Sequence, residues 1–173
     1  MRRRLSSPAP RGLMHTKLVR GYLLYFSLLW LSYSILVWIR LDWLAYFTGI
    51  DFFHSPHGVI EGRAMYGGLE VALAIFAFLG FWKPETYLMP NALLWGMINT
   101  GFVTARIIGI VVDGGTFAVP WGVLPDSWNA GAMYFLEAPS ALIFGSYWIA
   151  RTRAESRGEA VVETGGIARR AAA

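Results

Sequence analysis

The chain has 173 residues and a formal net charge of +4, and 55% of its residues are hydrophobic, 16% aromatic and only 15% charged. With a mean hydropathy of +0.45, this composition excludes an ordinary soluble domain and indicates a single membrane-embedded domain. The absence of cysteine excludes disulfides, thiolate metal sites and a cysteine nucleophile.

The chain begins with a basic tail, residues 1–17, which contains Pro8, Pro10 and Gly12 and is expected to be disordered. Residues 18–39 are then apolar, with Arg20 and three serines as their main polar positions, and they are long enough for a first membrane helix. This run is too long for a signal peptide and lacks a small-x-small cleavage site. We therefore interpret it as an uncleaved anchor.

The first predicted loop, residues 40–61, opens with an aromatic-rich segment, residues 41–47, that suits the bilayer interface. Four potential metal ligands follow: Asp51, His54, His57 and Glu61. Imidazole and carboxylate groups suit divalent ions, but Pro56 and Gly58 argue against a continuous helix here. We favour a solvated loop over a metal site, and keep His54, His57 and Glu61 as candidate ligands only.

The second predicted span, residues 62–82, carries two charges, Arg63 and Glu70. Seven residues make almost two helical turns, so both side chains are expected on one face, with Gly67 between them. Ala64, Gly68 and Ala72 form a small-xxx-small row that permits close approach of another helix.

A turn at residues 83–86 leads to the third predicted span, residues 90–112, so that spans two and three are expected to be antiparallel neighbours. Asn99, Arg106 and Asp113 are each seven residues apart and share a face, while Gly96, Thr100 and Thr104 form a second small row.

An outer loop up to Asp126 precedes the fourth predicted span, residues 128–150, which contains Glu137 and Pro139. The proline is expected to kink this helix, because it leaves the carbonyl of Phe135 without its usual donor. Residues 151–173 are charged, rich in Gly and Ala, and expected to be disordered.

Lysine and arginine are unevenly distributed between the spans: the terminal flanks and Lys83 hold 12 of the 15, whereas the two opposite loops hold only Arg40. Because positive residues favour the cytoplasmic side, we predict an all-α integral membrane four-helix bundle with both termini cytoplasmic, in a bacterial inner membrane. The basic ends lack an aromatic-interleaved surface, so we predict the lipid bilayer, and no nucleic acid, as a partner.

Four charges fall inside the predicted spans: Arg63, Glu70, Arg106 and Glu137. At 1.5 Å per residue the last three lie roughly 9 to 13 Å from the outer ends of their spans, so all four are expected to form one charge-balanced cluster. Tyr66, Asn99 and Tyr134 are candidates for supporting hydrogen bonds. Intramembrane charges are costly and normally face protein.

Two interpretations of this cluster stay open. In one, Arg106 binds the acidic head group of a small molecule or lipid, and Glu70 or Glu137 holds a proton. In the other, Arg106 clamps the two acids and fixes helix register. No haem, nucleotide, zinc-protease or hydrolase signature is present, so no catalytic residue and no cofactor is predicted.

The motif from Glu61 to Glu70, the pair Ala105-Arg106 followed by Asp113-Gly114, and Glu137 in the last helix resemble domain-of-unknown-function family 4345. These are small bacterial membrane proteins with four predicted helices. The resemblance covers about residues 20 to 150. It implies that these polar positions matter as a set, and it implies no activity.

The sequence favours a non-enzymatic role, as an accessory subunit or binding protein of a larger membrane complex or homo-oligomer. The alternative is a small-molecule transporter or a lipid-modifying enzyme that binds an acidic head group through Arg106.

Overall fold

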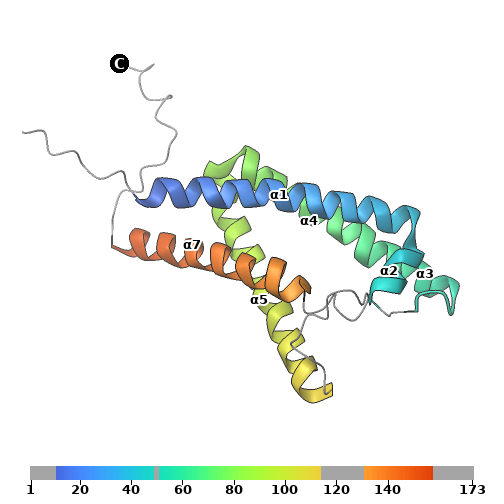
Figure 1. Ribbon diagram of the computed structural model, residues 1–173. Helices are drawn as coiled ribbons and strands as arrows, with labels where there is room; N and C mark the ends of the chain where they lie inside the picture. Colours follow the sequence, from blue (N-terminus) through green and yellow to red (C-terminus); the bar gives the residue numbers. More distant parts are fainter. Residues whose placement is uncertain (1–10, 49–50, 114–130, 158–173) are drawn as a thin grey trace, which may run out of the picture.

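The computed structural model describes residues 11–48, 51–113 and 131–157 (Figure 1). Every regular element in these ranges is helical, which confirms the predicted all-α class. The second predicted outer loop, the start of the predicted fourth span and the outer parts of both predicted tails lie outside the described residues.

The described helices are, in chain order, α1 (Arg11–Ile39), α2 (Leu41–Thr48), α3 (Pro56–Arg63), the π-helical turn η1 (Ala64–Gly68), α4 (Leu69–Trp82), α5 (Pro84–Asp113), the π-helical turn η2 (Met133–Glu137) and α7 (Ala138–Ser156). Three stretches are long and apolar enough to cross a membrane, which indicates a membrane protein: His15–Ile39, Pro56–Trp82 and Pro84–Val112. The helix ending at Ser156 is not among them, so a fourth crossing stays a prediction.

Helices α1 and α3 begin earlier in the chain than predicted. Helix α1 begins at Arg11, so residues 11–17 are helical and not disordered. Helix α3 begins at Pro56 and continues through η1 into α4, so the expectation that Pro56 and Gly58 would prevent a helix is wrong. The proline occupies the first turn, where a backbone N–H has no helical partner in any case, and the hydroxyl of Ser55 caps the helix by accepting from the N–H of Gly58 at 3.2 Å.

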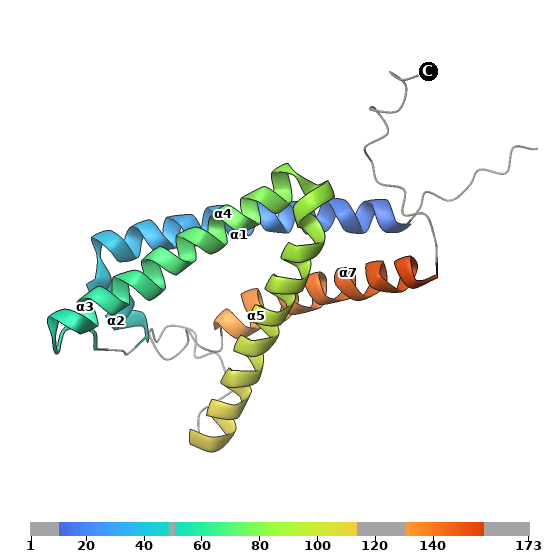
Figure 2. The same ribbon diagram turned by 180° about the vertical axis from the view of Figure 1, so that it is seen from behind.

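The connection between α4 and α5 is a single residue, Lys83. Helix α5 begins at Pro84 and not at Pro90, which lies inside it. Two antiparallel helices need a loop of a few residues to fold back on one another. With this short junction and with Pro90 inside it, α5 crosses α4 steeply, in place of the antiparallel alignment expected for spans two and three (Figure 2).

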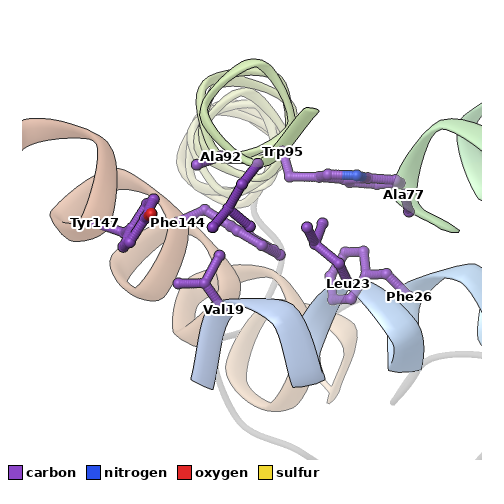
Figure 3. Packing of buried hydrophobic residues seen from close by; sticks show 9 residues of the cluster. Val19, Leu23, Phe26, Ala77, Ala92, Trp95, Phe144 and Tyr147 are labelled. Carbon is purple, nitrogen blue, oxygen red and sulfur yellow. The ribbon is translucent and has the colours of Figure 1, made fainter. Parts of the chain in front are cut away.

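Helices α1 and α4 lie side by side and run in opposite directions, while α5 crosses them steeply and α7 packs against α5 (Figure 1 and Figure 2). Figure 3 shows the same relation from close by, with α5 viewed along its axis and α1 from the side. The four long helices thus depart from the aligned bundle that the sequence suggested.

One hydrophobic core joins all four long helices where they meet (Figure 3). Its buried members are Val19, Leu23, Phe26, Ala77, Leu88, Ala92, Trp95, Phe144 and Tyr147. At its centre the rings of Phe26 and Trp95 contact edge to face, with centroids 4.7 Å apart. Helices α5 and α7 approach closely at Gly96, where an added Cβ would lie 3.4 Å from the backbone nitrogen of Gly145.

The helix ends that carry basic residues gather at one end of the molecule. Arg20 of α1 donates to the carbonyl of Phe81 near the end of α4 at 3.1 Å. His15 of α1 contacts the ring of Tyr147 of α7 edge to face. The start of α1, the α4–α5 junction and the end of α7 are therefore neighbours, as Figure 1 shows.

The small residues that pack α4 against α1 are not the predicted row. Ala64, Gly68 and Ala72 are exposed, and nothing lies within 4 Å of a Cβ added at Gly68. The buried small residues are Gly67, Ala74, Ala77 and Gly80. At Gly67 an added Cβ would lie 2.0 Å from Nε1 of Trp38 on α1, so this contact requires glycine.

Two neighbouring glycines therefore make a matched test of the α1–α4 seam. We expect Gly67→Ala to displace Trp38 and to lower the free energy of unfolding by about 1–3 kcal/mol, the usual cost of overpacking. Gly68→Ala adds the same methyl group into open space and should leave stability unchanged or raise it slightly, because alanine favours helix. Unfolding of both variants in detergent, followed by circular dichroism, measures the difference. Equal effects of the two substitutions would contradict the seam described above.

Candidate functional site: a buried ion pair and a separate half-buried glutamate

Arg106 of α5 and Glu137 of η2 form a two-armed ion pair. Nε of Arg106 donates to one carboxylate oxygen of Glu137 and Nη2 to the other, each at 2.7 Å. The side chain of Glu137 is only 6% exposed, and that of Arg106 is 24% exposed. Parallel bonds of this kind are the strongest and most directional arrangement of a guanidinium and a carboxylate.

The local backbone at Glu137 is shaped by Pro139. Pro139 lacks an N–H, so it cannot donate to the carbonyl of Phe135 as the fourth residue along a regular helix would. The chain widens into the π-turn η2, in which the N–H of Ala138 donates to the carbonyl of Met133. The hydroxyl of Ser140, itself fully buried, donates to the carbonyl of Leu136. The predicted perturbation at Pro139 thus takes the form of a π-turn that ends at Glu137.

The pair satisfies the condition for placing charges in an apolar helix. A single charge in the membrane interior costs roughly 2.5–3.5 kcal/mol on insertion scales. Here both charges are neutralised and both carboxylate oxygens accept a hydrogen bond. The arrangement can hold α5 and η2 in register, and it occupies two of the donor nitrogens with which Arg106 would bind an external anion.

Glu70 lies elsewhere, in the seam between α1 and α4. It follows η1 on the face that also carries the buried residues Gly67 and Ala74. Its Oε2 atom is buried and has no hydrogen-bond partner. Tyr33 of α1 lies within electrostatic range of both Glu70 and Tyr66. Among the described residues, no arginine, lysine or histidine forms an ion pair with this carboxyl group.

The π-turn η1 separates Arg63 from Glu70. In η1 the N–H of Leu69 donates to the carbonyl of Ala64, five residues earlier. The wider turn changes the rotation per residue, so a seven-residue spacing no longer brings the two side chains to one face. Arg63 is exposed, and its backbone carbonyl accepts from Nε1 of Trp38 at 3.3 Å. The prediction that Arg63 and Glu70 share a face is wrong for this reason.

The three residues that were candidates for supporting hydrogen bonds lie in different surroundings. Asn99 is buried, but its side-chain amide donates to the carbonyl of Trp95 at 2.7 Å, one turn earlier in the same helix. Tyr66 packs beside the cluster of Val37, Leu41, Leu44 and Phe52. Tyr134 of η2 is 43% exposed. The expected single cluster is thus two sites, the Arg106–Glu137 pair and the Glu70 seam.

The first loop does not gather a metal site. Within the described ranges no group of three or more His, Asp or Glu side chains is placed to hold a metal ion. His54 lies 3.3 Å from a carboxylate oxygen of Asp51, and its side chain is 84% exposed. His57 and Glu61 are exposed on α3. Closer to α1, the guanidinium of Arg40 hydrogen-bonds Asp42 and holds the pKa of that carboxyl below its usual range.

Two residues of the α1–α4 seam, Tyr33 and Trp38, could not be identified from the sequence. Tyr33 is one of several tyrosines in the first span, and nothing in its spacing distinguishes it. Trp38 lies near the end of the first predicted span, where interfacial anchoring is the usual explanation of a tryptophan. A glycine doublet beside a charged residue, Gly67-Gly68 before Glu70, was the available signal for close approach by an indole ring.

No family model matches the chain, and no curated protein or solved structure shows significant similarity to it. The resemblance to domain-of-unknown-function family 4345 stays a prediction.

The ion pair leads to a test by double-mutant cycle. Arg106→Leu or Glu137→Leu alone leaves one buried charge without its partner and should lower the free energy of unfolding by about 3–5 kcal/mol. The double substitution removes both charges and should cost much less than the sum of the two. Arg40→Leu breaks an exposed pair and serves as the control, with little change expected. Additive losses in the cycle would contradict the pairing.

Proposed function

We propose that this chain is a four-span protein of a bacterial inner membrane with both termini in the cytoplasm, and that it acts as a non-enzymatic accessory subunit or binding protein of a larger membrane complex. The Arg106–Glu137 pair is then a structural clamp inside the protein. This proposal favours one of the two interpretations that the sequence left open.

The observation that carries the proposal is the two-armed bond between Arg106 and Glu137. A head-group site would present the guanidinium to an incoming carboxylate or phosphate. Here Nε and Nη2 already donate to a protein carboxylate that is almost completely buried. An external anion that bound Nε and Nη2 in the same two-armed way would have to displace Glu137 and leave its charge unpaired, at a cost of several kcal/mol. The transporter and lipid-modifying alternatives, which depend on Arg106, are therefore disfavoured.

One end of the molecule carries Arg20, Lys83 and Arg151. Because basic residues favour the cytoplasmic side, this clustering supports the proposed orientation. At the other end, α2 buries Leu41 and Leu44 and exposes Trp43 and Tyr46. That division suits a short helix lying in a membrane interface.

A subunit needs surface for a partner helix, and small exposed residues provide it. Ala64, Gly68 and Ala72 face away from α1. Thr100 and Thr104 are exposed on α5, with their hydroxyls donating to carbonyls one turn earlier at 2.7 and 2.8 Å. Such surfaces permit close helix contact in a bilayer.

Native mass spectrometry of the gently solubilised protein tests the role. We expect the wild type and the double variant Arg106→Leu with Glu137→Leu to carry the same protein partner, because the clamp only supports the fold. A bound lipid or anion that is present in the wild type and lost from a still-folded Arg106→Leu variant would overturn the proposal in favour of the head-group site. Arrival of the wild type as a bare monomer from native membranes would also contradict it.

The absence of cysteine makes the orientation directly testable. Lys83→Cys should be protected from a membrane-impermeant maleimide in intact spheroplasts and labelled after lysis. His54→Cys, whose position is exposed at the opposite end, should be labelled in intact spheroplasts. The reverse pattern would show an inverted topology.

A further inference from the structure

The Glu70 carboxyl is not used by the clamp and has no role in the proposed subunit function. It lies in the α1–α4 seam, between Gly67 and Ala74 in the chain, and both of these small residues are buried. Its Oε2 atom is buried without a hydrogen-bond partner. A buried polar group that lacks a partner is rare in proteins, because its desolvation is not repaid.

The titratable groups around Glu70 come from the two elements packed beside it. Tyr33 of α1 is within electrostatic range of Glu70, and Tyr33 is also within range of Tyr66 of η1. Both tyrosines are half-buried. Arg63 is exposed on the far side of the π-turn, and Arg106 is bound to Glu137. Within the described part of the chain, Glu70 therefore has Tyr33 within electrostatic range and no ion-pair partner.

These surroundings distinguish the two states of the carboxyl group. An ionised carboxylate only accepts hydrogen bonds, and in an apolar seam without a positive charge it is strongly disfavoured. A protonated carboxyl is neutral and also donates an O–H, for which a tyrosine oxygen is a suitable acceptor. The seam thus fits the neutral acid and not the carboxylate.

We propose that Glu70 is a proton-binding site in the α1–α4 seam, with Tyr33 on the facing helix α1. The ligand is the proton itself. Its uptake and release switch a charge off and on between two membrane helices, which is the elementary step that proton-coupled membrane proteins use. Glu137 is the internal contrast, because its carboxylate is bound by Arg106 and has no need of a proton.

Infrared difference spectroscopy tests the protonation state without any requirement for access. The spectrum of the wild type minus that of Glu70→Gln at neutral pH should contain the C=O stretch of a protonated carboxylic acid. The matched control is Glu61→Gln, an exposed position on the same continuous helix, which should remove carboxylate bands only. A Glu70→Gln difference that contains carboxylate bands only would overturn the proposal.

Carbodiimide labelling keeps the proposal testable if Glu70→Gln does not fold. An apolar carbodiimide such as dicyclohexylcarbodiimide takes the proton of a carboxylic acid on nitrogen and bonds the carboxyl oxygen to its central carbon. The O-acylisourea then rearranges to a stable N-acylurea, so the whole reagent is added and nothing leaves. Peptide mass spectrometry of the wild type should find the adduct on Glu70 and none on Glu137. An adduct on Glu137 with none on Glu70 would overturn the proposal, and neither outcome depends on the presence of a protein partner.

Discussion

A charge on an apolar helix must be neutralised before the helix can be stable in a membrane, and the pair of Arg106 and Glu137 meets this requirement on the part of the fold that needs it most. No residue of α5 beyond Asn99 is fully buried. The hydrophobic core around Trp95 holds only the first half of that helix. The ion pair fixes the second half to η2 and α7, where apolar packing is weakest.

Helix α5 follows α4 after a single residue, Lys83, and contains Pro90. Pro84 begins the next helix at once. Helix α5 crosses α1 and α4, and its second half extends beyond them (Figure 1). Helix α7 becomes its main neighbour, through the Gly96–Gly145 approach and through Arg106. The ion pair thus lies on the part of α5 that has α7 as its main neighbour.

The sequence predicted the helical class, the apolar stretches and the partnership of Arg106 with an acid, because hydropathy and the cost of isolated charges are local properties of the chain. It failed where the helix is not regular. Spacing arguments assume 3.6 residues per turn, and η1 breaks that assumption between Arg63 and Glu70. Spacing alone also could not show which of Gly67 and Gly68 packs against α1. Both are glycines, and only the position of Trp38 distinguishes them. The four-charge cluster divided into two sites because α5 crosses α1 and α4 steeply, so its second half packs on η2 and α7 and not in the α1–α4 seam (Figure 1).

The two acids, Glu70 and Glu137, both lie at a π-turn but have different residues facing them. Each lies at the C-terminal side of a π-turn, and such turns are often found at functional positions because they redirect a side chain at little cost to the helix. Glu137 meets an arginine and becomes part of the framework. Glu70 meets α1 at Tyr33, and α1 contributes no basic group to that stretch of the seam. If α1 carried a lysine or arginine there, both carboxylates would be clamps. The absence of that residue in the described seam leaves the proton as the simplest counter-charge for Glu70, and it makes the π-turn at η1 the feature that connects the fold to a chemical property.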